Sequence, residues 1–96
     1  MLESKFQAKL IKDLENEFPG CLVLKNDSSY KQGIPDLSIF YRDKWAMLEC
    51  KKDKTAGHQP NQDAYVERLN GMSYAAFIFP ENREEILSEL RQVFGS

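Results

Sequence analysis

Two short apolar segments in the middle of the chain limit its possible folds more than any other feature. The segments Leu37–Tyr41 and Trp45–Cys50 are rich in residues that favour strands, and the polar residues Arg42, Asp43 and Lys44 separate them. Two such segments with so short a connection predict a β-hairpin. The fold must therefore contain a sheet in which these two strands are neighbours.

The register of this hairpin decides which side chains meet. If Arg42-Asp43 is a two-residue loop, Tyr41 pairs with Lys44, and continuing the pairing places Asp36 directly opposite Glu49. Their Cβ atoms would then be about 5 Å apart. A longer loop or a bulge would shift the register. The sequence thus predicts two neighbouring carboxylates, provided that the loop is this short.

Alternation along the two strands assigns their last residues to opposite faces. It puts Asp36, Glu49 and Lys51 on one face of the sheet and turns Cys50 to the other. Two carboxylates in contact repel each other unless a proton or a cation lies between them, and hard oxygen ligands suit Mg²⁺ or Mn²⁺. A divalent metal beside a lysine can support phosphodiester hydrolysis. The alternative is that Asp36 is a turn residue, with Glu49 and Lys51 an exposed ion pair.

The rest of the chain supplies helices and two further strands. Leu2, Phe6, Leu10, Leu14 and Phe18 recur every fourth residue, which predicts a helix that ends at Pro19-Gly20. A capping box of Asn82 and Glu85 predicts the start of the last helix. The other expected elements are a strand over 21–25, a helix from Pro60 to a break at Asn70-Gly71, and a strand over 73–79. The predicted fold is α/β in the order α-β-β-β-α-β-α, one domain over 1–96, with a central mixed four-stranded sheet flanked by helices.

Composition excludes several classes of protein. The longest apolar run is the six residues 74–79, so we expect neither a membrane span nor a secretory signal, and the protein is predicted to be intracellular and cytoplasmic. The single His and two Cys do not form a zinc-binding pattern. The net charge is −2, but residues 25–58 hold seven Lys or Arg against five acids. This basic middle permits binding to nucleic acid.

The segment Gly33-Ile34-Pro35-Asp36, followed by a strand and then Glu49-Cys50-Lys51, resembles the active-site pattern of the PD-(D/E)XK nuclease superfamily. The leading glycine makes it most similar to the VRR-NUC branch, small nucleases found in phages and in replication and repair proteins. This resemblance implies a restriction-endonuclease-like core that acts as a homodimer on branched DNA such as Holliday junctions, in DNA repair or recombination. The resemblance also implies, as one source, a phage gene that is expressed in a bacterial host. The alternatives are a structure-independent nickase or exonuclease and a non-catalytic nucleic-acid-binding module.

The resemblance also implies roles for individual residues. Asp36 and Glu49 would be ligands of Mg²⁺ or Mn²⁺, the Cys50 carbonyl a further ligand, and Lys51 the catalytic lysine. The enzyme would then be a metal-dependent deoxyribonuclease without an organic cofactor.

Two further residues match less strongly. Glu3 corresponds to an acid on the first helix that would also bind metal, although a capping box of Ser4 and Gln7 would make it a solvated acid outside that helix. Gln62 corresponds to the active-site glutamine of the second helix, but it could also be a helix cap. Gln59 is its rival if that helix starts earlier.

Two polar segments beside these residues are predicted to contact DNA. They supply lysines and hydrogen-bond donors suited to phosphate, and the alternative for each segment is a solvated loop. The residues are Lys25, Ser29, Tyr30, Lys31, Gln32, Lys52, Lys54 and His58.

Overall fold

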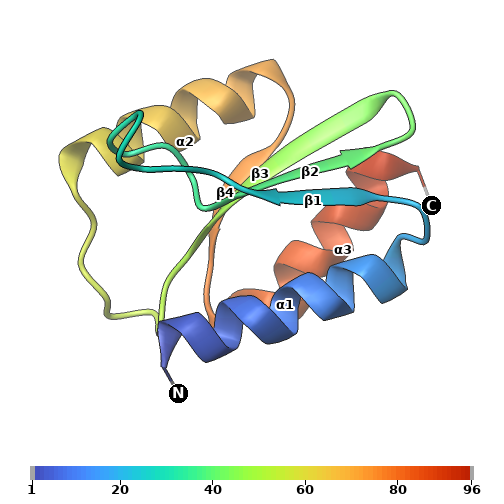
Figure 1. Cartoon of the computed structure of the whole chain (residues 1–96), viewed down its shortest axis with the longest axis horizontal. Coiled ribbons are helices and arrows are strands. Elements are labelled where there is room, and N and C mark those ends of the chain that lie inside the picture. Colours follow the sequence, from blue (N-terminus) through green and yellow to red (C-terminus); the bar gives the residue numbers. More distant parts are fainter. Residues whose placement is uncertain (1, 96) are drawn as a thin grey trace.

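The computed structural model describes residues 2–95 and has the predicted order of elements (Figure 1). Met1 and Ser96, the two ends of the predicted domain, lie outside the described residues. No helix within the described range has the length and apolarity needed to cross a membrane. The elements are α1 (Glu3–Glu17), β1 (Leu22–Lys25), β2 (Leu37–Tyr41), β3 (Lys44–Cys50), α2 (Pro60–Met72), β4 (Ala75–Ile78), a 3₁₀ turn (Pro80–Asn82) and α3 (Arg83–Phe94).

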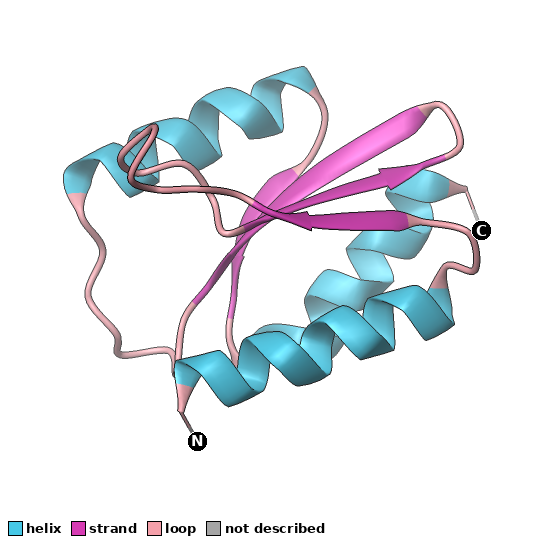
Figure 2. Ribbon diagram, in the orientation of Figure 1, coloured by secondary structure: helices cyan, strands magenta, loops and turns pink. Residues whose placement is uncertain are grey.

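The four strands form one mixed sheet in the order β1-β2-β3-β4. β1 and β2 are antiparallel, as are β2 and β3, whereas β3 and β4 are parallel. The parallel pair requires a crossover connection, and α2 provides it. Figures 1 and 2 show α1 and α3 on one side of the sheet and α2 on the other. The predicted α/β class and the helix-flanked mixed sheet are confirmed.

The β2–β3 hairpin has the predicted register. Tyr41 pairs with Lys44, and the ladder continues to Leu37 opposite Leu48. Arg42 adopts a positive φ of 60°, as a tight two-residue loop requires. Its guanidinium carbon lies 4.8 Å from the centre of the Tyr41 ring, and this contact is attractive. Asp36, which directly precedes β2, therefore lies beside Glu49 near the end of β3.

The hydrophobic core lies between the sheet and the helices α1 and α3. Alternate residues of β2 and β3 point into it, and an aromatic cluster of Phe18, Tyr41 and Phe94 closes one end, with ring centres 5.1–5.6 Å apart. The fully buried large side chains include Leu10, Leu14, Phe18, Leu37, Ile39, Leu48, Ile78, Leu90 and Phe94.

The opposite face of the sheet is covered only in part. α2 packs on β3 and β4, and none of its residues is buried. On β1 and β2 the large side chains of Leu22, Leu24 and Phe40 remain 42–56% exposed. This face, which we call the α2 face, therefore has room for a functional site.

Three helix signals differ in detail from the structure, although α3 begins at Arg83, directly after Asn82, as the sequence predicts. α2 runs through Asn70-Gly71 to Met72, because the Asn70 side chain accepts a hydrogen bond from the Ala75 backbone and helps the chain turn later. Asn82 does not cap α3 with its side chain, which instead bonds the Phe79 N–H and the Phe77 carbonyl. The Ser4–Gln7 capping box is absent, since Leu2 occupies the N-cap position and Glu3 is already helical.

Candidate active site

Asp36 and Glu49 are joined by hydrogen bonds that extend the strand ladder. The Asp36 backbone N–H donates to Glu49 Oε1 at 3.1 Å, and the Cys50 N–H donates to Asp36 Oδ2 at 2.9 Å. Each acid therefore binds the backbone of the opposite strand. Glu49 is only 4% exposed, so the pair is built into the end of the hairpin. The alternative of a solvated turn acid beside an exposed ion pair does not describe this geometry.

Burial makes these two carboxyl groups difficult to ionise together. Burial, and then the charge of Asp36, raise the pKa of Glu49 to about 7, against a smaller opposing effect of the Lys51 ammonium. Burial also raises the pKa of Asp36, although the Cys50 N–H and Lys51 oppose the change. In the absence of a cation, the two carboxyl groups therefore tend to share a proton near neutral pH.

Lys51 lies next to the pair and is 7% exposed. Its Nζ donates to Gln62 Oε1 at 2.9 Å and to the Gly57 carbonyl at 3.0 Å, and it lies 3.7 Å from Glu49 Oε2. Its backbone N–H donates to the Ile78 carbonyl, which holds this residue against β4. The ammonium therefore has a defined position beside the carboxylates.

Gln62 connects the lysine to the acid. Its Nε2 donates to Glu49 Oε2 at 2.9 Å, while its Oε1 accepts from Lys51 and from the Gln59 backbone N–H at 3.0 Å. The residue thus supplies an amide to the site and also caps the start of α2. Gln62, and not the exposed Gln59, therefore contacts Glu49 and Lys51 with its side chain, and its catalytic role stays a prediction.

Cys50 faces the core, as alternation predicts. Its thiol is fully buried, and burial, followed by the nearby charge of Asp36, raises its pKa to about 12. Because this thiol lies in the apolar core and not on the face that carries Glu49, it is not placed to bind a metal beside the carboxylates. The backbone carbonyl is the one group of Cys50 that remains a candidate ligand.

Glu3 lies in the first turn of α1 and is exposed, which differs from the inward direction that its spacing predicts. Its charge nevertheless contributes to the raised pKa values of Glu49 and Cys50. Among residues 2–95, no three His, Cys, Asp or Glu side chains are gathered as a metal-binding group.

The donor chemistry of the site fits a hard divalent cation. Asp36 Oδ1 makes no hydrogen bond to the described residues, and a buried pair of carboxylates with raised pKa values gains from a neighbouring cation. Carboxylate oxygens are the ligands that Mg²⁺ and Mn²⁺ prefer.

The loop after β1 is held in place by side chains that the sequence analysis did not assign. Asn26 donates from Nδ2 to the Pro35 carbonyl at 2.9 Å and accepts from the Ser38 hydroxyl at 3.0 Å. Gly33 has a φ of 93°, and a Cβ atom there would lie 2.7 Å from Cγ of Asn61 in α2. The sequence showed that a glycine precedes Ile-Pro-Asp, but nothing in it indicated that this glycine contacts Asn61.

The predicted DNA-contacting residues lie on the two loops that flank the site, or at the ends of the adjoining strands. Tyr30 is 86% exposed, with Lys31 Nζ 5.9 Å from its ring centre. The Ser29 hydroxyl is already bonded to Asp27, whereas only the backbone carbonyl of Gln32 is bonded, by Asn61 Nδ2, and its side chain is free of that contact. The side chains exposed without such restraint are Lys25, Lys31, Gln32, Lys52 and Lys54.

His58 makes two defined side-chain contacts. Its ring stacks on Phe77 with the centres 3.8 Å apart, and its Nδ1 lies 2.9 Å from an Asp63 carboxylate oxygen. The preceding residue, Gly57, supplies the carbonyl that accepts from Lys51. The imidazole therefore lies on the same rim as the catalytic lysine candidate.

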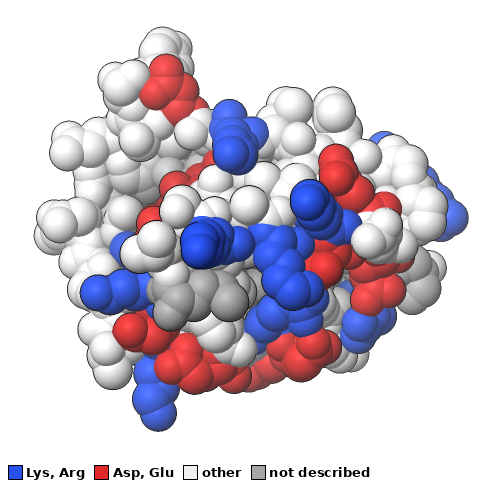
Figure 3. Space-filling model, turned by 60° about the horizontal axis from the view of Figure 1, so that its bottom comes forward, with Lys and Arg blue, Asp and Glu red and all other residues white. Residues whose placement is uncertain are grey.

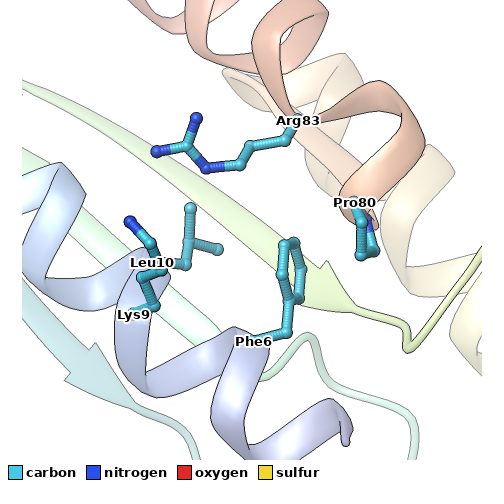
Figure 4. Close-up of a pocket in the computed structure, with 5 residues that line it drawn as sticks. All are labelled: Phe6, Lys9, Leu10, Pro80 and Arg83. Carbon is cyan, nitrogen blue, oxygen red and sulfur yellow. The ribbon is translucent and has the colours of Figure 1, made fainter. Parts of the chain in front are cut away.

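A cavity between α1 and the start of α3 differs from this site in its chemistry. It has a volume of 310 Å³ and contains no carboxylate among its lining residues, which are Phe6, Lys9, Leu10, Pro80 and Arg83 (Figure 4). Its two cations, Lys9 and Arg83, are both paired with Asp13.

On the side of the molecule shown in Figure 3, acidic and basic side chains are interspersed, so this side presents no uniform charge.

Comparisons with known proteins agree with the fold. No family model matches the chain, and no curated protein matches it. A solved structure described as a VRR_NUC domain protein superimposes with a TM-score of 0.72 at 17% sequence identity, covering 97% of this chain and 90% of that one. The chain therefore has the fold of a VRR_NUC domain protein.

Proposed function

We propose that this protein is a Mg²⁺- or Mn²⁺-dependent DNA endonuclease that hydrolyses phosphodiester bonds. The observation that carries the proposal is the pair of half-buried Asp36 and buried Glu49, with Lys51 held beside it by Gln62. Its VRR_NUC-like fold supports the assignment.

The roles of the residues follow from their contacts. Asp36 and Glu49 would hold the metal, with the Cys50 carbonyl and Glu3 as additional ligands. The bound ion would lower the pKa of a water molecule and polarise a phosphate oxygen. Lys51, whose ammonium is fixed by Gln62 and Gly57, would offset the negative charge that develops on the phosphate oxygens. Hydrolysis would join the water oxygen to phosphorus and break one P–O ester bond.

Two further observations bear on the substrate and the assembly. The exposed lysines and Tyr30 on the flanking loops suit a DNA backbone and an accessible base. The exposed side chains of Leu22, Leu24 and Phe40 form an uncovered apolar surface that suits a second subunit. Both support a homodimer that acts on branched DNA such as a four-way junction, where two sites cut two strands.

The test is cleavage of a labelled four-way junction and of its matched linear duplex, each with Mg²⁺, Mn²⁺ or EDTA. We expect metal-dependent cutting of the junction, and a loss of at least about 100-fold in Lys51→Ala. Lys44→Ala is the matched control, since this lysine is exposed at the far end of the hairpin.

Three results would change the proposal. Equal cutting of both DNAs would retain the chemistry and remove the selectivity for branches. Cutting in EDTA, or by Lys51→Ala at the wild-type rate, would overturn the assigned site. Binding of DNA with no cleavage under any condition would favour a non-catalytic binding module.

A further inference from the structure

A second cavity on the α2 face lies beside the carboxylates and has no assigned role. Its volume is 520 Å³, within the range of about 300–1,000 Å³ that is usual for small-molecule sites. It lies between the loop after β1 and the surface of β3. The lining residues are Asn26, Asp27, Tyr30, Lys31, Ile34 and Met47.

The position of this cavity relates it directly to the candidate active site. Ile34 precedes Asp36 by two residues, and Met47 precedes Glu49 by two residues on the same face of β3. Two residues along a strand span about 7 Å. The cavity therefore begins about one nucleotide away from the carboxylates that would act on the phosphate.

The lining chemistry suits a flat, partly polar aromatic group. Ile34 and Met47 offer apolar surface, and the Tyr30 ring is 86% exposed, so core packing does not occupy its faces. Asp27 Oδ1 accepts from the Ser29 N–H and hydroxyl, while its Oδ2 makes no hydrogen bond to the described residues. Those bonds lower the pKa of Asp27, so Oδ2 remains an ionised acceptor for an amino group. Lys31 adds a cation at the rim.

We propose that this cavity receives one unpaired nucleobase of the DNA strand next to the scissile phosphate, stacked against Tyr30. A nucleobase combines a flat ring with edge donors, which are the features that Tyr30 and Asp27 would recognise. A base inside a duplex is stacked on both faces and paired at its edge, so it cannot enter. The inference rests on the proposed nuclease function and extends it: the enzyme selects sites that carry an unpaired nucleotide, as branch points do.

The first experiment measures insertion of the base without cleavage. A duplex with one bulged 2-aminopurine is titrated with protein in EDTA, and the fluorescence is compared with that of the same base paired in a continuous duplex. We expect strong quenching for the bulged base only, lost in Tyr30→Ala and retained in Tyr30→Trp. Met72→Ala is the control, because Met72 is an exposed apolar residue outside the cavity. Equal quenching by wild type and Tyr30→Ala, or no quenching, would overturn the proposal.

The second experiment measures the contribution of the base to cleavage. With Mn²⁺ present, a bulged nucleotide is compared with an abasic nucleotide at the same position. We expect wild type to cut the abasic substrate about tenfold more slowly and Tyr30→Ala to cut both at one rate. Equal rates for wild type would count against base insertion.

The two experiments separate failure of this inference from failure of the nuclease assignment. If no DNA is cut, the nuclease assignment fails, while the fluorescence measurement still decides whether a base enters the cavity. If DNA is cut with no dependence on the bulged base and no quenching, only the cavity proposal fails.

Discussion

The two faces of the sheet use the same strands for different purposes. On the side of α1 and α3, Leu48 and its neighbours are fully buried in an apolar core. On the α2 face, Glu49 and Lys51 are almost as buried but are held by hydrogen bonds, and α2 contributes no buried residue. Adjacent positions of one strand thus alternate between the apolar core and the polar candidate site.

This difference shows how a chain of 96 residues can keep charged groups out of water. The apolar side chains at alternate positions fix the backbone of β2 and β3, and that backbone then donates N–H groups to Asp36 and Glu49. The core face therefore supports the geometry of the polar face. Substitutions on the two faces should have separable effects on stability and activity.

The largest expected effect on folding comes from the core face. Leu48→Ala should lower the free energy of unfolding by about 2–5 kcal/mol, because the leucine is fully buried and leaves a cavity. Leu24→Ala, at a position 44% exposed on the α2 face, should change it by less than about 0.5 kcal/mol. Urea denaturation followed by tryptophan fluorescence measures both. Equal losses would contradict the division between the faces.

The next effect is a pH dependence that arises on the α2 face. Because the pKa of Glu49 is raised to about 7, the folded state binds an additional proton between its unfolded value of 4.5 and about 7. Stability without metal should therefore fall as the pH rises through this window, by an amount of the order of 3 kcal/mol.

Denaturation in EDTA from pH 5 to 8, for wild type and Glu49→Gln, measures this contribution. The difference between the two proteins reports the titration of the Asp36–Glu49 pair, since they share every titrating group outside it. We expect Mn²⁺ to stabilise wild type at pH 8 more than at pH 6 and to have little effect on the variant. A flat difference across this pH range would show that Glu49 ionises normally.

A smaller effect is expected at the contact between the loop and α2. Gly33→Ala should cost about 1–3 kcal/mol, because of its positive φ and because its new Cβ meets Asn61. Gly20→Ala is a matched control, since Gly20 has a similar φ of 90° and no atom within 4 Å of an added Cβ. Thermal unfolding should show a larger loss for Gly33→Ala, part of which Asn61→Ala restores. Equal losses of stability in Gly33→Ala and Gly20→Ala would show that backbone strain accounts for the whole effect.

The smallest effect should come from an ion pair on the α1–α3 side. Burial alone would raise the pKa of Asp13, but hydrogen bonds from Arg83 and Lys9 outweigh it and lower the pKa. The pair should add less than about 1 kcal/mol at neutral pH, and this contribution is lost as the pH falls through the lowered pKa.

Arg83→Gln should therefore destabilise the protein slightly at pH 7 and not at pH 2.5, as measured by urea denaturation. Arg68→Gln is the control, because the Arg68 side chain makes no ion pair to the described residues. A difference between wild type and Arg83→Gln that persists at pH 2.5 would indicate a packing role for the arginine.

Local patterns predicted most of the fold. The hairpin register followed from a two-residue loop, and that register alone placed Asp36 beside Glu49. Helix ends were less predictable, because the Asn70 and Asn82 side chains bond the backbone of the adjoining strand β4 instead of capping a helix, and a helical pattern does not reveal this choice.

The site was predictable where it depends on one hairpin and less so where it joins separate elements. Sequence matching left open whether Gln62 or Gln59 faces the acids, and that choice depends on how α2 packs over β3. The stacking of His58 on Phe77 and the approach of Gly33 to Asn61 connect residues far apart in the chain. Such contacts depend on tertiary packing and leave no periodic signal.

The two-residue hairpin loop also has an evolutionary consequence. Its length sets the register of the strands, although it lies about 20 Å from the carboxylates by strand geometry. One inserted residue that slipped the register would turn Glu49 toward the core and Cys50 toward the site. Among descendants of this sequence, insertions and deletions at this turn should therefore be much rarer than within residues 52–56, which lie between Lys51 and Gly57 and set no strand register.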